Sequence, residues 1–213
     1  MTTVGADEAG KGPVLGPMVC AAVRAPPAAL EGVDDSKALS PERRERVAAR
    51  LRDDDRVAVG VEAIAVSRID DPETDMNGLA LAGQAAAVRA VARAGDRVVA
   101  DAADVDAARF GRRLRESVEG ADHEVVAEHR ADERHPVVGA ASVVAKVERD
   151  RRIERLAAEY GDVGSGYPSD PTTREFLRTF VRDHGRLPAC ARSSWATCAD
   201  LLAAAEQSAL DEF

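Results

Sequence analysis

Three short apolar segments of this chain run directly into an aspartate. They are TTVGAD at residues 2–7, RVVAD at 97–101 and HEVVAEHRAD at 123–132. Runs of β-branched and apolar residues of this length are typical of buried strands. Because each predicted strand ends on a carboxylate, the segments indicate that acids gather along one edge of a sheet.

The remaining periodic segments place helices between and after the strands. Two further strands are predicted from PMVCAAVRA and RVAVGVEAIAV, and helices are predicted from Pro41 behind the N-cap Ser40, over 78–95 with Gly95 closing the helix, over 136–160, over 174–185 and from about Trp195. The 213 residues fit one large domain or one domain with a small appendage. The pattern favours an α/β fold in which a mixed sheet is flanked by helices.

The chain is acidic, with a net charge of −9. Nucleic-acid-binding proteins usually carry a basic surface instead. The basic residues comprise 26 arginines and only three lysines, and this lysine-poor, alanine-rich profile resembles that of proteins from salt-loving microbes. We therefore interpret the acidity as an adaptation to the solvent.

Three cysteines, Cys20, Cys190 and Cys198, are sparse and lack the spacing of zinc ligands. They predict reduced thiols in a core and a cytosolic protein. The N-terminus has no basic segment followed by an apolar one, and the alanine-rich stretch 78–95 is interrupted by Gln84 and two arginines. Neither export nor a membrane span is expected.

The run GADEAGKG near the N-terminus is open to two interpretations. Its glycines and Lys11 match most of a nucleotide-binding P-loop, which also needs a Ser or Thr hydroxyl for Mg²⁺ after the lysine. Gly12 occupies that hydroxyl position, and Asp7 with Glu8 would bring two carboxylates against the phosphates. The residues therefore argue against a P-loop.

An adjacent acidic pair carries little information by itself, because 38 acids in 213 residues give about seven such pairs by chance. Asp7 and Glu8 differ from a random pair because they end a predicted strand and enter a glycine-rich turn. Clustered carboxylates do not all stay ionised without a cation, and oxygen-only clusters suit Mg²⁺ or Mn²⁺. With Asp101 and Asp132 at other strand ends, the acids are consistent with a metal-dependent phosphoryl-transfer site. Surface acids on a protein adapted to salt are the alternative.

Six strings follow one another along the chain: GADEAGKGPVLGPMV, DDSKAL, ADAADV, EHRADERHPVVGAASVVAKVERDR, YGDVGSGYPSDPTTREFL and RSSW. Together they resemble the type 2 ribonucleases H, the ribonuclease HII family, and especially its archaeal members. The resemblance covers nearly the whole chain. It implies the ribonuclease H-like fold, a central mixed sheet flanked by helices, with a helical C-terminal part. It also implies endonucleolytic cleavage of RNA in RNA–DNA hybrids, and cleavage on the 5′ side of ribonucleotides embedded in duplex DNA.

The resemblance assigns the family's catalytic acids to Asp7, Glu8, Asp101 and Asp132. These four would bind two Mg²⁺ or Mn²⁺ ions. One ion would activate a water for attack on phosphorus and the other would stabilise the leaving 3′-oxygen. The expected products carry 3′-hydroxyl and 5′-phosphate ends.

Ribonucleotide recognition requires contact with the 2′-hydroxyl, the group that distinguishes RNA from DNA. By resemblance, the backbone of Gly10, Lys11 and Gly12 makes this contact, together with the ring of Tyr167 in the loop GSGYPSD. Lysine stands where the family more often has arginine, which keeps the charge but loses the bidentate guanidinium fork. We therefore expect recognition by the backbone and less phosphate binding by this side chain.

Four further polar residues are candidate contacts to substrate phosphates. Ser36 and Lys37 lie in DDSKAL, and Ser142 and Lys146 are four residues apart on one face of a predicted helix. The alternative for these residues is an ordinary solvated pair.

The resemblance also implies an organisation and partners. It divides a single domain into a catalytic core over 1–160 and a substrate-binding part, made of a loop and C-terminal helices, over 161–213. We expect a cytoplasmic monomer that binds RNA–DNA hybrid or ribonucleotide-containing duplex DNA, and a sliding clamp, but no membrane. Three alternatives stay open: a P-loop nucleotide-binding protein, a non-catalytic duplex-binding module with this fold, and an endonuclease V-like repair enzyme, which should lack the Gly-Lys-Gly and tyrosine sensor.

Overall fold

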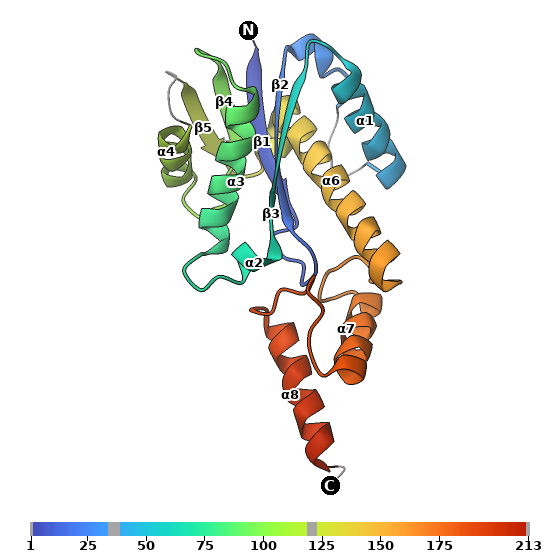
Figure 1. The fold of residues 1–213 in the computed structure, drawn as a ribbon. Coiled ribbons are helices and arrows are strands. Elements are labelled where there is room, and N and C mark those ends of the chain that lie inside the picture. Colours follow the sequence, from blue (N-terminus) through green and yellow to red (C-terminus); the bar gives the residue numbers. More distant parts are fainter. Residues whose placement is uncertain (1, 34–38, 119–122, 212–213) are drawn as a thin grey trace.

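The computed structural model describes residues 2–33, 39–118 and 123–211, and its centre is a five-stranded sheet (Figure 1). The strands are β1 (Thr3–Ala9), β2 (Met18–Ala25), β3 (Ala58–Ile64), β4 (Arg97–Asp101) and β5 (Glu124–Glu128). Their spatial order is β3-β2-β1-β4-β5. β1 pairs antiparallel with β2 and parallel with β4, so the predicted mixed sheet is confirmed. The central place of β1 gives its acids neighbours on both sides.

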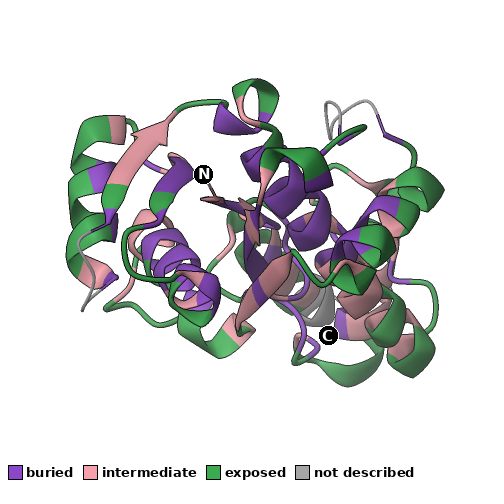
Figure 2. Ribbon diagram, turned by 90° about the horizontal axis from the view of Figure 1, so that it is seen from above, coloured by how far each residue is buried: buried purple, intermediate pink, exposed green. Residues whose placement is uncertain are grey.

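Helices cover both faces of the sheet and continue beyond one of its ends (Figure 1). They are α1 (Pro41–Asp53), α2 (Val66–Ile69), α3 (Met76–Val91), α4 (Ala107–Ser117), α5 (Ala131–Arg134), α6 (Pro136–Tyr160), α7 (Pro171–His184) and α8 (Ala196–Asp211), with a 3₁₀ turn η1 (Pro27–Ala29). α6 and α1 pack on one face, and α3 and α4 pack on the other. Buried residues accordingly follow the strands and the inner sides of the helices (Figure 2).

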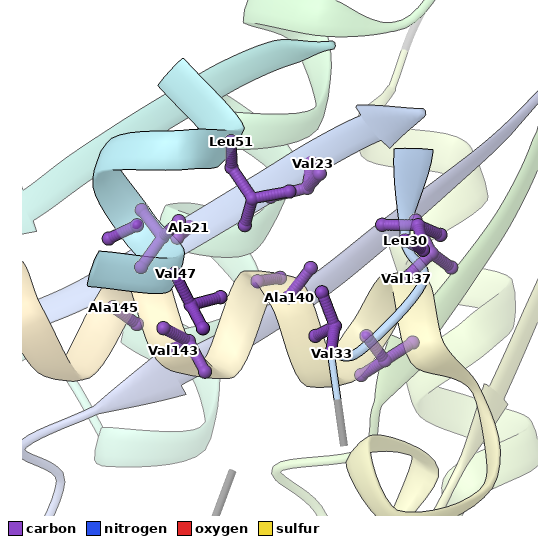
Figure 3. Packing of buried hydrophobic residues seen from close by; sticks show 14 of the residues in the cluster. Ala21, Val23, Leu30, Val33, Val47, Leu51, Val137, Ala140, Val143 and Ala145 are labelled. Atoms are coloured by element: carbon purple, nitrogen blue, oxygen red, sulfur yellow. The ribbon is translucent and has the colours of Figure 1, made fainter. Parts of the chain in front are cut away.

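Alternate residues of the strands β1, β2 and β4 belong to different cores. Val4 and Ala6 of β1 pack in the cluster that contains α3 and α4. Val23 of β2 packs with Leu51 and Val143 in the cluster beneath α1 and α6 (Figure 3). Because successive side chains of a strand point to opposite faces, Asp7 and Glu8 leave β1 on opposite sides of the sheet.

Gly5 allows β1 and α6 to touch through their backbones. A Cβ atom built on Gly5 would lie 2.3 Å from the carbonyl oxygen of Val137 and 2.6 Å from the nitrogen of Val138. Any larger residue would push α6 away from the sheet. The start of α6 is therefore fixed close to the strand that carries Asp7 and Glu8.

The C-terminal helices α7 and α8 lie beyond the end of the sheet toward which β1 runs (Figure 1). Leu177 of α7 packs with Leu15 and Val14 in a third cluster of buried residues. An isolated antiparallel bridge joins Leu15 to Ala191. The connection between β1 and β2 is thus part of the core that the C-terminal segment completes.

Several predicted bounds are wrong, and among them the helix expected over 174–185 spans Pro171–His184. The segment 123–132 does not run as a strand into Asp132, because β5 ends at Glu128 and Arg130 adopts a left-handed conformation with φ 56°. Asp132 therefore lies in the first turn of the short helix α5. The helix predicted over 78–95 begins earlier, behind the N-cap Asp75, and ends at Val91, so its predicted closing glycine lies in the following turn.

All three cysteines are buried and free, as the sequence predicted. Among the described helices, none combines the length and the apolar character that crossing a bilayer requires.

Candidate functional site

Asp7 and Glu8 are each held by the helix on their own side of the sheet. Asp7 is 5% exposed and accepts a hydrogen bond from the Ser142 hydroxyl of α6. Glu8 Oε2 accepts a hydrogen bond of 2.6 Å from Gln84 Nε2 of α3. The two acids are consecutive in sequence, yet their side chains are oriented by different layers of the fold.

Asp101 and Asp132 reach the same end of the sheet from later parts of the chain. β4 runs parallel to β1. The last residue pair between the two strands directly precedes Asp7 on β1 and Asp101 on β4. Asp101 Oδ1 accepts a hydrogen bond of 2.8 Å from the backbone nitrogen of Ala131. Asp132 is the next residue and is 8% exposed. The structure therefore brings Asp7, Glu8 and Asp101 together and places Asp132 next to the bond that holds Asp101.

Burial and repulsion between carboxylates both raise the pKa of Asp7 and of Glu8. Burial raises the pKa of Asp7 well above its usual value, and the charges of Glu8 and Asp101 raise it further. Burial also raises the pKa of Glu8 to about 7, although the hydrogen bond from Gln84 and the charge of Lys11 oppose this shift. A bound cation relieves repulsion of this kind.

The chemistry of the four acids fits a hard divalent cation. All four supply only carboxylate oxygens, the donors that Mg²⁺ and Mn²⁺ prefer. Within the described residues, no three Asp, Glu, His or Cys side chains already converge on a common ion position. Asp7, Glu8 and Asp101 instead accept hydrogen bonds from protein N–H groups. Because a carboxylate has about four lone-pair sites on its two oxygens, these donors leave sites on each acid for an ion.

A cleft of about 450 Å³ opens beside Glu8. Its lining contains the predicted residues Gly10, Lys11, Gly12, Lys146 and Tyr167, together with Ala9, Arg44, Arg149 and Asp150. Four of the lining side chains are basic and two are acidic, in a chain whose net charge is −9. The cleft is therefore a locally basic region that suits a phosphate backbone.

The Gly-Lys-Gly loop bends sharply after β1. Gly10 has a φ of 87°, a conformation that favours glycine, and a Cβ atom there would lie 3.1 Å from the carbonyl oxygen of Pro17. Lys11 Nζ donates to Asn77 Oδ1 at 2.7 Å and to the carbonyl oxygen of Ala103 at 2.6 Å. These bonds hold the ammonium near Glu8, consistent with the weaker phosphate role expected for Lys11.

Tyr167 faces the loop across the cleft. Its side chain is 42% exposed, and its ring lies 4.0 Å from the Cβ position of Gly12. The guanidinium of Arg149 lies 5.1 Å from the ring centroid, and Arg149 Nη2 donates to the carbonyl oxygen of Ser165 at 2.8 Å. An exposed ring that is supported in this way offers a stacking surface to a ligand in the cleft.

The other predicted phosphate contacts have different outcomes. Lys146 lines the cleft, and its phosphate contact stays a prediction. Ser142, one turn earlier on α6, is 1% exposed and bonds to Asp7, so the structure gives it a carboxylate partner in place of the expected phosphate. Ser36 and Lys37 lie outside the described residues.

Four further residues support the site, although the sequence did not assign them roles there: Gln84, Arg149, Arg192 and Trp195. Gln84 is fully buried and donates to both Glu8 and the carbonyl oxygen of Asp101. The sequence signal for a role of Gln84 was that it is the lone amide in the apolar helix predicted over 78–95. Arg192 and Trp195 hold carbonyl groups of the Gly-Lys-Gly loop, and only their presence in the string RSSW pointed to them.

The sequence model of the ribonuclease HII family matches residues 4–198. The chain belongs to this family. Ribonuclease HII of Haloarcula marismortui is 62% identical over 210 residues, which cover 98% of this chain and 99% of the relative. The match confirms the resemblance found in the sequence, and it favours ribonuclease HII over the P-loop protein and the endonuclease V-like enzyme.

Solved structures of the family agree with the fold. The ribonuclease H2 from Pyrococcus horikoshii OT3 is 35% identical, with a TM-score of 0.88 over 97% of this chain and 100% of that one. Ribonuclease HII of Archaeoglobus fulgidus, solved as a PCNA complex, is 40% identical, with a TM-score of 0.82 over 92% and 95% of the two chains. Membership in the ribonuclease HII family makes the chain a ribonuclease H-type endonuclease, a hydrolase from a metal-dependent family.

Proposed function

We propose that this ribonuclease HII cleaves the RNA strand of RNA–DNA hybrids and cuts duplex DNA on the 5′ side of embedded ribonucleotides. The observation that carries the proposal is the basic cleft, which is lined by Glu8, the Gly10–Lys11–Gly12 loop and Tyr167. One cavity thus offers an acid for hydrolysis beside a backbone and an aromatic ring for sensing the sugar. Residues 1–160 form the catalytic core in this proposal, and 161–213 complete the substrate-binding part of the same domain.

We assign Asp7, Glu8, Asp101 and Asp132 to hold two divalent cations, Mg²⁺ or Mn²⁺. Such a pair, when bound, activates water for in-line attack and stabilises the leaving 3′-oxygen, which yields 3′-hydroxyl and 5′-phosphate ends. The protein's own donors prepare the acids for this task. Gln84 orients Glu8, and the backbone nitrogen of Ala131 orients Asp101.

Substrate contacts follow from the lining of the cleft. The backbone of Gly10, Lys11 and Gly12 contacts the ribose, and Tyr167 stacks beside it. Lys146 contacts a phosphate of the bound duplex. The phosphate contacts of Ser36 and Lys37 remain predictions from the sequence, and we reassign Ser142 to orienting Asp7.

The test is cleavage of a labelled DNA duplex that carries one ribonucleotide, in Mg²⁺ or Mn²⁺. The protein should cut on the 5′ side of that nucleotide. Asp7→Asn should lower the cleavage rate by about 10²–10³-fold, the size seen when one electrostatic group is removed from a catalytic site. Binding of the duplex should be retained, which separates an enzyme from a non-catalytic binding module.

Asp106→Asn is the matched control. Asp106 caps α4 by accepting a hydrogen bond from the backbone nitrogen of Arg109, and asparagine caps helices equally well. This variant should cleave at the wild-type rate. A cut elsewhere than at the ribonucleotide, or full activity of Asp7→Asn, would contradict the proposal.

We also propose that the protein acts in the cytoplasm as a monomer beside a sliding clamp. The support for the clamp is the Archaeoglobus fulgidus relative, which was solved as a complex with PCNA. Leu210 and Phe213 are apolar residues in an otherwise small and polar C-terminal sequence, and they suit a short peptide contact. Co-elution with the clamp, lost in a variant that ends at Glu206, is the expected result, and co-elution that persists would exclude contact through the tail.

A further inference from the structure

Two side chains from the C-terminal segment hold the Gly-Lys-Gly loop by its carbonyl groups. Arg192 Nη2 donates to the carbonyl oxygen of Gly10 at 2.7 Å, and Nη1 donates to that of Lys11 at 3.0 Å. Trp195 Nε1 donates to the carbonyl oxygen of Gly12 at 3.3 Å. Every carbonyl group of the tripeptide is therefore bound by a residue from the other end of the chain.

These bonds also set the direction of the loop's N–H groups. In a trans peptide the C=O and the following N–H point in opposite directions, and the described residues contain no cis peptide. Because the carbonyl groups of Gly10 and Lys11 point at Arg192, the N–H groups of Lys11 and Gly12 point away from it. Neither N–H has a hydrogen-bond acceptor in the part of the chain that the structure describes, and both residues line the cleft.

Arg192 occupies an unusual place for a charged side chain. It is fully buried, its Nε donates to the carbonyl oxygen of Gly16 at 2.9 Å, and its guanidinium lies 5.0 Å from the centroid of the Trp195 ring. Burial and the neighbouring charge of Arg149 lower the pKa of Arg192 to about 10. Burying a charge is unfavourable unless its hydrogen bonds are satisfied, and here three backbone carbonyls satisfy them.

We propose that Arg192 is a positioning residue for ribonucleotide recognition, because it turns the N–H groups of Lys11 and Gly12 toward the substrate. The inference rests on the proposed function and adds the part that orients the sensor. Successive N–H groups that face one way form a concave site for an oxygen acceptor, and the ribose 2′-hydroxyl supplies such an oxygen. The planar fork of arginine fixes two carbonyl groups at once, which a lysine ammonium does not reproduce.

The experiment measures binding without cleavage, in the Asp7→Asn background. Affinities are compared for a duplex with one ribonucleotide and for the same duplex made only of DNA. Asp7→Asn alone should prefer the ribonucleotide duplex. Adding Arg192→Lys should lower that preference by about tenfold, the effect of losing roughly one good hydrogen bond, while the affinity for all-DNA duplex stays unchanged.

Arg186→Lys is the matched control for the lysine substitution. Arg186 also lies over an aromatic ring, 5.6 Å from the Phe180 centroid, and donates to a backbone carbonyl, but it is exposed and does not line the cleft. Its replacement should leave the preference unchanged. Trp195→Phe keeps an aromatic ring against Arg192 and removes only the bond to Gly12, so it should lose part of the preference.

The outcomes separate the two proposals. If Asp7→Asn shows no preference for the ribonucleotide, the proposed function is wrong. If the preference exists and survives Arg192→Lys, the positioning role is wrong. An equal loss of affinity for both duplexes would make Arg192 a structural residue only and also overturn the inference. If Arg192→Lys does not fold, Trp195→Phe serves as the test instead. An unchanged preference of that variant for the ribonucleotide duplex would then overturn the positioning role.

Discussion

Burial raises the pKa of Glu8, and one buried amide opposes this effect. Gln84 Nε2 donates to Glu8 Oε2 at 2.6 Å and to the carbonyl oxygen of Asp101 at 3.0 Å. A hydrogen bond to a carboxylate is charge-assisted and favours its ionised form. Burial acts in the opposite direction and raises the pKa of Glu8 to about 7. Gln84 therefore stabilises the ionised form of Glu8, the form that a divalent cation would bind.

Gln84→Met should destabilise the metal-free protein in a pH-dependent manner. The pKa of Glu8 lies near 7 in the folded state, above its usual value of 4.5, so ionised Glu8 costs stability increasingly as the pH rises through this range. Gln84 offsets this cost only when Glu8 is ionised. The variant should lose about 2 kcal/mol at pH 8.5, or about 4–8 °C in Tm, and less than half of that at pH 5.5.

Thermal melts in the presence of a chelator check this prediction. Arg89→Met on the exposed side of α3 is the control, because Arg89 donates to the carbonyl oxygen of Ser117 and not to a carboxylate. Its effect on Tm should be the same at both pH values. A loss for Gln84→Met that does not change with pH would show that the amide acts only through Asp101 or through packing.

At the scale of helices and strands, the local sequence pattern predicted bounds that depend on neighbouring residues. It did not predict features that depend on contacts between distant segments. The predicted bounds of α6, 136–160, are those observed, because apolar periodicity, Pro136 and Gly161 all lie within or next to the segment itself. The predicted end of β5 was wrong because a single left-handed residue, Arg130, starts a new element.

The four acids of the candidate site were assigned from family motifs, since an acidic pair alone occurs at chance frequency. Arg192 could not be assigned a role, because its hydrogen bonds to a loop at the other end of the chain leave no periodic trace.

The contact between β1 and α6 predicts a large effect of Gly5→Ala. The added Cβ would meet backbone atoms of Val137 and Val138, which have no rotamer that relieves the clash. We expect a loss of about 3 kcal/mol in the free energy of unfolding, at the upper end for overpacking. Gly95→Ala is the comparison, since nothing lies within 4 Å of its Cβ position and only its φ of 80° opposes the change. It should cost about 1 kcal/mol. Equal losses in chemical denaturation would contradict close packing at Gly5.

Across the whole molecule, charge is distributed unevenly. The net charge is −9, yet the cleft gathers Lys11, Arg44, Lys146 and Arg149 against two acids. Excess negative charge opposes compaction, and dissolved salt screens it. Similar relatives include ribonucleases HII of Haloarcula and Halobacterium. We therefore expect the acidic composition to serve stability in salt and the basic cleft to serve substrate binding.

The global charge predicts that the folded state gains stability in concentrated salt. Raising KCl from about 0.2 M to about 3 M at pH 7.5 should increase Tm by at least about 4 °C, which corresponds to about 1–2 kcal/mol for a chain of this size. Differential scanning calorimetry measures the change. At pH 4.5 fewer carboxylates are ionised, so the same salt step should have a smaller effect. A Tm that does not change with salt at pH 7.5 would remove the interpretation of the acidity as an adaptation to brine.

The hydrogen bonds between the Gly-Lys-Gly loop and residues 192–195 have a consequence for the order in which the chain folds during synthesis. All four acids, from Asp7 to Asp132, are synthesised well before Arg192 leaves the exit tunnel. A growing chain can therefore complete its acidic centre while the Gly-Lys-Gly turn still lacks the guanidinium that orients it. On the proposed role of Arg192, discrimination between ribose and deoxyribose is the last property that we expect the newborn protein to acquire.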